Sequence, residues 1–260
     1  MHISATIVAL NEEQNIERAI QSLACADEIV VVDGGSSDRT RELAAVMGAR
    51  VISQPWLGYA AQKNFAAQCA VHDWILSIDA DEEVSPKLAE EIFRLKSEGP
   101  RADAYSFPRL ARYLGKWIRH SGWYPDRKVR LYRRDRARWV GDYVHESVRV
   151  EGSSAELRGN LRHYTCDSLA DHLRTLDRYT TLAAEELRAR GRRVGLLKLA
   201  VSPPWTFLRT YFLQAGFLDG AAGFTLARMA ALYTFRKYSK ARRKQAVTHE
   251  AAGDANPAPR

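Results

Sequence analysis

The first hundred residues alternate short apolar runs with segments of helical periodicity. The apolar, β-branched runs that predict strands lie at 3–10, at 28–38 with a glycine-rich turn at its end, at 50–54 and at 74–79. The segments that repeat apolar residues every three or four positions, and so predict helices, lie at 15–23, 39–47 and 59–70. Buried strands that alternate with helices are typical of βαβ units. The pattern therefore predicts an α/β fold with a mainly parallel sheet and helices on both faces.

Polar residues stand where three of these strands end. Asn11 follows the first strand, Asp33 closes the β-branched part of the second, and Asp79 closes the fourth. The carboxyl ends of parallel strands share one edge of a sheet, and α/β proteins bind ligands at that edge. We therefore expect a ligand site there. Asn11 is also expected to cap the next helix together with Gln14.

The fourth strand runs into four carboxylates within five positions, in the sequence WILSIDADEEVSP. Carboxylates at this density repel one another unless a cation or a helix N-terminus lies close by. Ser85 is the predicted N-cap of a helix, so Glu82 and Glu83 just before it would face a favourable dipole. That explanation leaves out Asp79 and Asp81. Their spacing suits a hard divalent ion that also binds a substrate phosphate.

The second half of the chain changes character twice. Residues 101–165 are aromatic and basic, in a pattern that predicts strands of a mixed or antiparallel extension. Residues 168–191 have helical periodicity, and charged residues interrupt the apolar stretch that follows. No uncharged run in that stretch is long enough to span a bilayer. We expect amphipathic helices that either lie on a membrane surface or pack back onto the domain.

These changes predict three regions. Residues 1–165 form one domain, with a first half at 1–100 and a second half at 101–165. Residues 166–245 form a helical extension that is able to associate with a membrane. Residues 246–260 have the composition of a disordered tail.

The net charge of +8 is unevenly distributed along the chain. Residues 187–249 contain thirteen Lys or Arg against one acid, a local net charge of +12, and residues 109–138 contain eleven Lys or Arg against two acids. Such segments attract phosphates in nucleic acid, anionic lipid or a phosphorylated substrate. Three widely separated cysteines argue against a disulfide framework or zinc cluster and favour a reducing compartment. The first apolar run is cut off at Asn11, which favours a strand over a signal peptide.

Several blocks occur in a fixed order: Asn-Glu-Glu after the first strand, then VVVDGGSSDRT, then LSIDADEE. With these blocks the chain resembles the family 2 glycosyltransferases, whose fold is the GT-A nucleotide-diphospho-sugar domain. The later blocks HSGWYPDRKVRLYRRDRARWVGDYVHESV, HYTCDSLADHLRTLDRYTTLAAEEL and FLDGAAGFTLARMAALYTFRKY resemble the bacterial lipopolysaccharide core β-1,4-glucosyltransferases. The likeness covers roughly residues 1–245. The D-x-D element alone is a weak signal, but the blocks together are specific.

The resemblance implies a binding site for a nucleotide-diphospho-sugar donor, with a UDP-sugar favoured. It makes residues 1–100 the donor half and residues 101–165 the acceptor half of the domain. The residues that it assigns to the donor are Ala9, Leu10, Asn11, Glu12, Asp33, Lys63, Asp79, Ala80 and Asp81. Glu12 would face the ribose and Asp33 would hydrogen-bond the base. Asp79 and Asp81 would form the D-x-D pair that holds Mn²⁺ or Mg²⁺ against the diphosphate, with the second Asp binding the ion. The family's usual Pro and Tyr before Asn11 are Ala and Leu here, which removes an aromatic ring that could pack against the base.

The resemblance also implies an inverting, single displacement with no covalent enzyme intermediate. The sugar, with glucose favoured, would move to a hydroxyl of a lipopolysaccharide inner-core saccharide, and a carboxylate must take the proton from that hydroxyl. The candidate bases are Asp126, Asp142 and Glu146, of which Glu146 is preferred. Neighbouring side chains on a strand point to opposite faces, so Glu146 would yield to Asp142 if His145 faced the cleft.

An inner-core acceptor carries phosphates and acidic sugars, which the basic middle segment could bind. The residues expected to bind the acceptor are Trp123, Arg127 and Arg130, with Trp117, Tyr124 and Trp139 offering further flat faces to sugar rings. His163 and His172 are expected to be structural.

Three other interpretations of the sequence remain open. A polyprenyl-phosphate sugar synthase, or another glycan-assembling family 2 transferase, would share the first half and a membrane-facing C-terminus. A nucleic-acid-binding protein would use the basic and aromatic stretches but not D-x-D, so no nucleic-acid partner is expected. A dinucleotide-binding oxidoreductase lacks support because no G-x-G-x-x-G follows the first strand. The expected location is cytoplasmic and peripheral, on the inner face of a bacterial inner membrane with an anionic surface.

Overall fold

A computed structural model describes residues 1–141, 146–166 and 168–253, with side chains described as far as residue 242. By their internal contacts these residues form two compact units. Unit 1 comprises Met1–Ala111 and Pro125–Thr165, and unit 2 comprises Arg112–Tyr124 and Cys166–Arg260.

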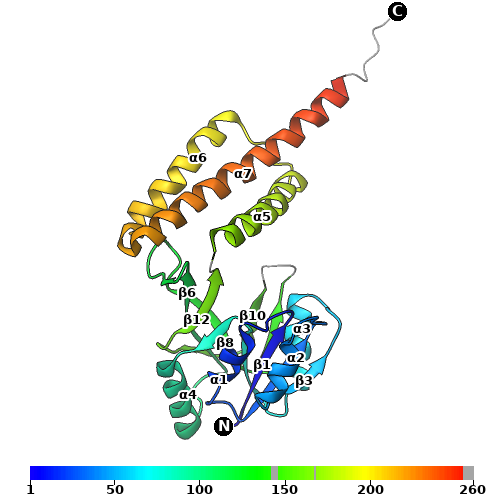
Figure 1. Ribbon diagram of the computed structural model, residues 1–260, viewed down its shortest axis with the longest axis vertical. Helices are drawn as coiled ribbons and strands as arrows, with labels where there is room; N and C mark the ends of the chain where they lie inside the picture. The colour runs from blue at the N-terminus through cyan, green and yellow to red at the C-terminus, as the bar shows by residue number, and fades with distance from the viewer. Residues whose placement is uncertain (142–145, 167, 254–260) are drawn as a thin grey trace, which may run out of the picture. The chain divides into compact units, whose positions relative to one another are not determined.

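Unit 1 is built on a mixed sheet whose first half is parallel (Figure 1). The parallel strands, in the order β3-β2-β1-β4, are β1 (Ile3–Ala9), β2 (Glu28–Asp33), β3 (Arg50–Ser53) and β4 (Trp74–Asp79). The helices that connect or follow them are α1 (Ile16–Gln21), α2 (Thr40–Val46), α3 (Tyr59–Cys69) and α4 (Pro86–Glu98). The α/β fold predicted from the alternating pattern is confirmed.

The two faces of the parallel half are covered by different helices. Alternate residues of β1, such as Ile3 and Ile7, pack in one buried cluster with α1, α2 and α4. Val30 and Val32 of β2 point the other way and pack with Ala66 of α3. Because side chains alternate across a strand, a run of apolar residues buries both faces, as the sequence predicted.

Antiparallel strands extend the sheet beyond β4. In spatial order they are β8 (Asp126–Arg133), β6 (Ala104–Tyr113), β12 (Leu161–Cys166) and β5 (Glu82–Val84). The short strand β11 (Ser154–Glu156) pairs in parallel with β6. Two further strands, β9 (Ala137–Val140) and β10 (Ser147–Val150), form an antiparallel pair. The Asn64 side chain of α3 holds β9 by donating to the Trp139 carbonyl and accepting from its N–H, both at 2.9 Å. The predicted mixed extension is therefore present.

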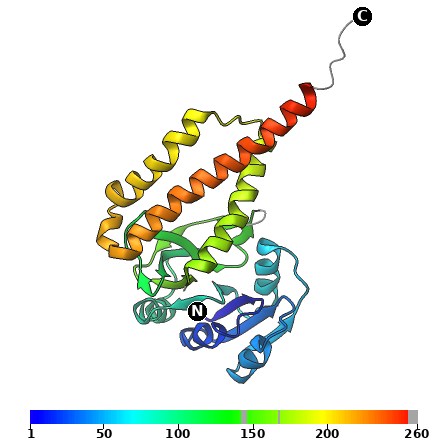
Figure 2. The same ribbon diagram turned by 45° about the horizontal axis from the view of Figure 1, so that its top comes forward.

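Unit 2 is mainly helical, with three helices lying side by side in both views (Figures 1 and 2). Its elements are β7 (Lys116–Trp117), α5 (Leu169–Ala189), α6 (Leu196–Leu208), the π-helical turn η1 (Arg209–Leu213), the 3₁₀ turn η2 (Gly216–Asp219) and α7 (Gly220–Gly253). Among the described residues, no helix combines the length and apolar character needed to cross a bilayer. Helix α7 continues past residue 246, where the sequence predicts a tail.

Residues 112–124 belong with these helices although the sequence places them in the acceptor half. Asp219 explains why. Its carboxylate is buried and accepts hydrogen bonds from the backbone N–H groups of Arg119 at 3.2 Å and His120 at 3.0 Å. Lys116 Nζ donates to the Asp219 carbonyl at 2.8 Å. One buried acid thus ties the segment to η2.

Two local predictions are corrected by the structure. Asn11 does not cap a helix: it has a positive φ of 57°, and α1 begins only at Ile16. Ser85 does cap α4, accepting from Leu88 N–H at 3.3 Å. Glu82, however, belongs to strand β5 and is fully buried, so a cation and not the helix dipole balances its charge.

Candidate active site

The edge formed by the ends of β1 and β2 is shaped by Asp33. Ala9 is its register partner on β1, and the Asp33 side chain has no exposed surface. Its Oδ2 accepts from the N–H groups of Gly35 and Ser36, each at 3.0 Å, and its Oδ1 accepts from the Ser36 hydroxyl. The buried carboxylate therefore fixes the glycine-rich turn that follows β2.

The loop after β1 lies against that turn. Asn11 N–H donates to Ser36 Oγ at 2.9 Å, and Asn11 Oδ1 accepts from Ser37 N–H at 2.9 Å. Glu12 N–H donates to Thr40 Oγ1 at 2.8 Å, while Leu10 is half exposed. These bonds bring the predicted loop, Ala9 to Glu12, beside the turn built by Asp33.

Glu12 lies at an acidic part of this edge. Burial raises the pKa of the Glu12 carboxyl, a hydrogen bond from Asn15 opposes the rise, and the charges of Asp81, Asp38 and Asp79 add to it. Negative charges that raise the pKa of a neighbouring carboxyl in this way favour the approach of a cation.

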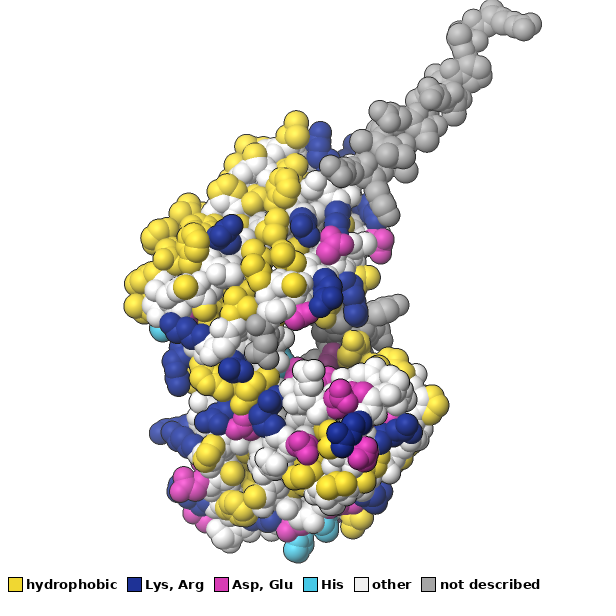
Figure 3. Space-filling view, in the orientation of Figure 1, with side chains coloured by type: hydrophobic (Ala, Val, Ile, Leu, Met, Phe, Trp, Pro, Cys, Tyr) yellow, Lys and Arg dark blue, Asp and Glu magenta, His cyan; other side chains and the backbone are white. Residues whose placement is uncertain are grey.

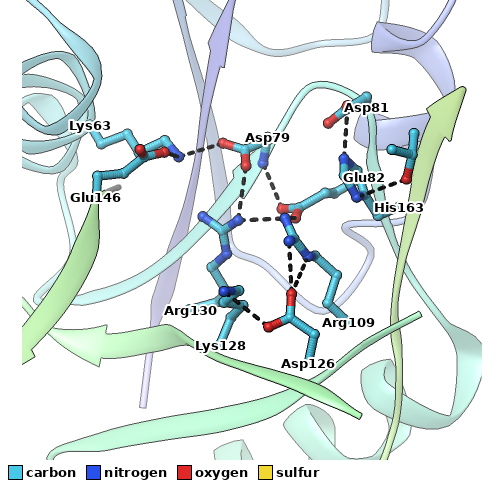
Figure 4. Close-up of polar contacts among 11 residues, drawn as sticks. Lys63, Asp79, Asp81, Glu82, Arg109, Asp126, Lys128, Arg130, Glu146 and His163 are labelled. Carbon is cyan, nitrogen blue, oxygen red and sulfur yellow. Dashed lines mark hydrogen bonds and ion pairs between the residues drawn. The ribbon is translucent and has the colours of Figure 1, made fainter. Parts of the chain in front are cut away.

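Asp79 sits between two buried cations at the end of β4 (Figure 4). Lys63 Nζ lies 2.7 Å from its Oδ1, and Arg130 lies 2.8 Å from its Oδ2. The Lys63 and Arg130 side chains are only 5% and 4% exposed. Burial alone would raise the pKa of Asp79, but the charges of Arg130 and Lys63 hold it well below its usual range. Both oxygens are thus occupied by protein cations.

Glu82 completes the same network from β5. Its Oε1 accepts from Arg130 at 3.0 Å, and its Oε2 accepts from Asp79 N–H at 2.9 Å. Burial raises the pKa of Glu82, against the opposing charge of Arg130 and with the support of Asp79. Arg130, predicted to bind the acceptor, contacts two carboxylates through Nη2, while its Nε and Nη1 are buried without a hydrogen-bond partner among the described residues.

Glu146 joins the network from the start of β10. Its Oε1 accepts from Lys63 Nζ at 3.1 Å, and its side chain is 16% exposed. The Trp139 ring lies against both cations, 4.3 Å from Lys63 Nζ and 5.1 Å from the Arg130 guanidinium carbon. Such cation–π contacts lower the cost of burying charge. Asp142, the alternative base, lies outside the described residues, as does His145.

A polar cavity of about 320 Å³ opens beside this network. Its wall includes Asp79, Glu146 and Trp139, together with four cationic side chains, those of Arg109, Arg127, Lys128 and Arg130. Asp126, the third candidate base, pairs with Arg109 at 2.7 Å and Lys128 at 3.0 Å. Arg127 pairs with the exposed Glu156 at 3.1 Å.

Trp123, the remaining predicted acceptor residue, belongs to unit 2. It packs there edge-on against Tyr113, with ring centres 5.7 Å apart. Lys63, predicted to contact the donor, and Glu146, predicted to be the base, are brought into direct contact in unit 1.

Asp81 has a partner that sequence reasoning missed. His163 is presented by β12, which pairs with β5, and its Nε2 lies 3.1 Å from Asp81 Oδ2. Burial lowers the pKa of His163, but the hydrogen bond and charge of Asp81 outweigh this and raise it. The two residues are 82 positions apart, so only the pairing of β12 with β5 reveals the contact.

The Asp81–His163 pair fits a divalent cation that takes its other ligands from a substrate. Carboxylate and imidazole suit Mn²⁺, and Mg²⁺ is usually held by one or two protein groups plus phosphate oxygens and water. Within the described residues no group of three or more His, Cys, Asp or Glu side chains is arranged to hold a metal ion by itself. Each carboxylate oxygen of Asp79 already has a cationic side chain of the protein beside it.

The chain is similar to several known proteins. The chain is 33% identical over 252 residues to an uncharacterized glycosyltransferase of Rickettsia typhi, covering 92% of this chain and 86% of that protein. It is 32% identical over 252 residues to the lipopolysaccharide core biosynthesis glycosyltransferase LpsC of Rhizobium meliloti, covering 94% and 93%. A solved structure, glucosyl-3-phosphoglycerate synthase from Mycobacterium tuberculosis with Mn²⁺ and UDP, matches 43% of this chain and 44% of that one, with 27% identity and a TM-score of 0.35.

The family description "Glycosyl transferase family 2" matches residues 4–154, which contain both the strand edge with its acids and the cavity beside Glu146. The fold is the mainly parallel α/β sheet of the GT-A type, followed by C-terminal helices. The chain therefore belongs to glycosyl transferase family 2.

Proposed function

We propose that this glycosyltransferase moves a sugar, glucose by preference, from a UDP-sugar to a phosphorylated saccharide of a lipopolysaccharide inner core. The reaction would be an inverting single displacement that requires Mn²⁺ or Mg²⁺. Similarity to LpsC along nearly the whole chain supports the acceptor class. The observation that carries the chemistry is the acidic strand edge lying next to a cationic cavity with Glu146 on its wall.

The donor would lie along the edge formed by β1, β2 and β4. The loop from Ala9 to Glu12 would hold the nucleoside, with Glu12 accepting from a ribose hydroxyl. Asp33 Oδ1 accepts only one hydrogen bond, so it keeps a lone pair for an N–H of the base. Because Asp33 is fully buried, that contact requires the Gly34 to Ser36 turn to open.

Asp81 and His163 would hold the divalent ion against the diphosphate. The ion, when bound, acts as a Lewis acid that offsets the charge developing on the leaving nucleoside diphosphate. Asp79 has a different role in this proposal. It orients Lys63 and Arg130, and Lys63 in turn can reach toward the diphosphate from its place between Asp79 and Glu146.

Glu146 would act as the base on the acceptor side. Its carboxylate lines the cavity and would take the proton of the attacking hydroxyl, while its bond from Lys63 sets its orientation. Arg127 and Lys128 would bind acceptor phosphate. Their present partners, Glu156 and Asp126, are 64% and 34% exposed, and exposed ion pairs of this kind are weak enough for a phosphate to displace.

The direct test is transfer of labelled glucose from UDP-glucose to an inner-core saccharide, with and without Mn²⁺. Glu146→Gln should lower the rate about a hundredfold or more, since general bases contribute at least that much. Asp126→Asn is the matched control, because Asp126 is already paired with two cations. Full activity of the Glu146→Gln enzyme would remove Glu146 from this role.

The same assay separates the nearest alternative, a polyprenyl-phosphate sugar synthase. That enzyme would transfer the sugar to a lipid phosphate and leave the inner-core saccharide unmodified. Because the proposed acceptor is a glycolipid, we also propose that the enzyme works as a peripheral protein at the cytoplasmic face of a bacterial inner membrane.

A further inference from the structure

Large apolar side chains are exposed together in one segment of unit 2. Of the twenty large hydrophobic side chains that are exposed among the described residues, nine lie between Leu196 and Leu218. Figure 3 shows hydrophobic side chains gathered over the part of the surface where Figure 1 draws α6. Monomeric proteins rarely leave such a patch in contact with water, so it calls for a partner.

The exposed side chains form a stripe at helical spacing. Leu197, Val201, Trp205, Leu208 and Phe212 follow one another at intervals of four, four, three and four residues, and each is at least 45% exposed. Residues at these intervals share one face of a helix. Leu213, Phe217 and Leu218 continue the patch through η1 and η2, at 69%, 49% and 58% exposed.

The opposite face of α6 is already occupied. Pro203 is buried, and Thr206 Oγ1 lies 3.2 Å from Thr234 Oγ1 of α7. Phe207 packs edge-on against Phe224 of α7, with ring centres 5.8 Å apart. The helix therefore buries one face within unit 2 and presents its larger apolar side chains outward. Helices that are apolar on every side occur in protein cores and in contact with lipid.

Charge around the stripe selects the partner. Residues 187–218 contain six Lys or Arg and no Asp or Glu, and two of the six, Arg188 and Arg190, pair with Glu185 and Glu186 of α5. A second copy of this chain docking face to face would bring two such cationic segments together, which is unfavourable. An anionic lipid surface neutralises them and also accepts the apolar side chains.

We propose that α6, η1 and η2 insert their exposed apolar face into the interface of an anionic bilayer, with the basic residues of 187–218 at the headgroups. This inference rests on the proposed glycolipid acceptor, because insertion would hold the enzyme where that acceptor lies. It assigns the attachment to α6 and its flanking turns, whereas the sequence pattern pointed only to the C-terminal region as a whole.

Trp205 is a natural reporter of insertion, since it lies in the stripe and is 55% exposed. The full chain is mixed with vesicles of phosphatidylglycerol and phosphatidylethanolamine, some carrying brominated acyl chains. We expect the brominated lipid to quench part of the tryptophan fluorescence, and the quenchable part to be missing in Trp205→Phe. We also expect binding to fall with added salt and to be much weaker on phosphatidylcholine vesicles.

Two matched double variants test the surface itself. Leu197→Asp with Leu213→Asp replaces stripe residues that are 77% and 69% exposed, and Val46→Asp with Val71→Asp replaces unit 1 residues of the same two exposures. The stripe variant should lower vesicle binding by about tenfold or more, because two apolar side chains no longer enter the lipid. The unit 1 variant should stay within about twofold of wild type. Far-UV circular dichroism is the control that checks whether both variants retain their helices.

Equal binding by the two variants would overturn the proposal, as would the absence of Trp205 quenching. A dimer that dissociates in the stripe variant, with no vesicle binding in wild type, would also overturn it and assign this face to a protein interface. Transfer to a soluble, lipid-free core saccharide should be unaffected by the stripe variant. If wild type bound vesicles but transferred no sugar, the proposed function would fail while the insertion surface stood.

Discussion

Replacing Asp79 by Asn should destabilise the protein far more than replacing Asp81, although both belong to the same D-x-D element. Asp79 lies 2.7 Å from Lys63 and 2.8 Å from Arg130, two cations that are nearly buried. An Asn side chain can accept a hydrogen bond from one cation but must turn its NH₂ group toward the other. Removing one partner from a fully buried ion pair costs about 3–5 kcal/mol, and the 29% exposure of the Asp79 side chain lowers that cost here.

Partial exposure and the remaining contacts place the cost for Asp79→Asn at or below the lower end of that range. Glu82 still accepts from Arg130 at 3.0 Å, and Glu146 still accepts from Lys63 at 3.1 Å. We therefore expect a loss of about 2–3 kcal/mol in the free energy of unfolding.

Asp81→Asn should behave differently. The Asp81 side chain is 30% exposed, pairs with His163, and adds to the charges that raise the pKa of Glu12. The variant loses the ion pair with His163 but also the repulsion between Asp81 and Glu12, and these two effects oppose each other. The stability change should therefore stay within about 1 kcal/mol. Binding of UDP should nevertheless lose its dependence on Mn²⁺, because one of the two proposed protein ligands is gone.

Urea unfolding of both variants, followed by far-UV circular dichroism, measures the first difference. Calorimetric titration of UDP with and without Mn²⁺ measures the second, and Asp79→Asn should keep most of the Mn²⁺ enhancement under conditions where it is folded. Equal destabilisation of the two variants would contradict the assignment of Asp79 to the ionic network. Retention of the Mn²⁺ effect by Asp81→Asn would contradict the metal site.

Three further predictions concern the acceptor, the packing and the pH dependence. Arg127→Ala should reduce kcat/KM about tenfold for a phosphorylated acceptor but leave donor hydrolysis unchanged; an equal loss with the dephosphorylated acceptor would make Arg127 structural. Gly223→Ala would place a Cβ 1.9 Å from a backbone oxygen and should destabilise by about 2 kcal/mol or more in urea, whereas Gly195→Ala meets nothing within 4 Å and should not. Hydrogen bonds from Lys96 and from a backbone N–H lower the pKa of Asp27 to about 2, below its unfolded value, although burial opposes the shift. The ionised carboxylate therefore stabilises the fold by about 1 kcal/mol above about pH 4, and this contribution is lost toward pH 2. Urea midpoints of wild type and Asp27→Asn should therefore converge as the pH falls from about 4 to 2, and a constant gap would exclude the carboxylate charge as the cause.

Local pattern alone predicted the parallel half of the sheet and the acids at its edge. The β-branched runs that became β1, β2 and β4 are buried on both faces, so their signal was continuous and strong. Parallel strands place their carboxyl ends together, and for that reason the sequence alone assigns Asp33 and Asp79 to one edge. The cap at Ser85 was equally local, because it depends on residues three apart.

Contacts between distant segments were not encoded in any local pattern. Lys63 and Glu146 are 83 residues apart, and their bond exists because α3 packs against β9, which pairs with β10, the strand that begins just after Glu146. His163 looked like an ordinary strand residue, and only the pairing of β12 with β5 places it at Asp81. Glu82 looked like a helix-dipole residue because Ser85 follows it, but tertiary structure buried it against Arg130.

The C-terminal region shows the same division most clearly. Periodicity predicted helices there but left open whether their apolar faces pack onto the domain or face outward, because a hydrophobic stripe has the same sequence pattern in both cases. The structure does both: Leu226 and Ala227 of α7 are buried, while Leu197 and Trp205 of α6 remain exposed. Sequence thus determined which segments are strands, helices and acidic strand ends, since these depend on neighbours along the chain. Which charges meet, and which apolar face is left for a partner, was decided only by packing between segments far apart in the sequence.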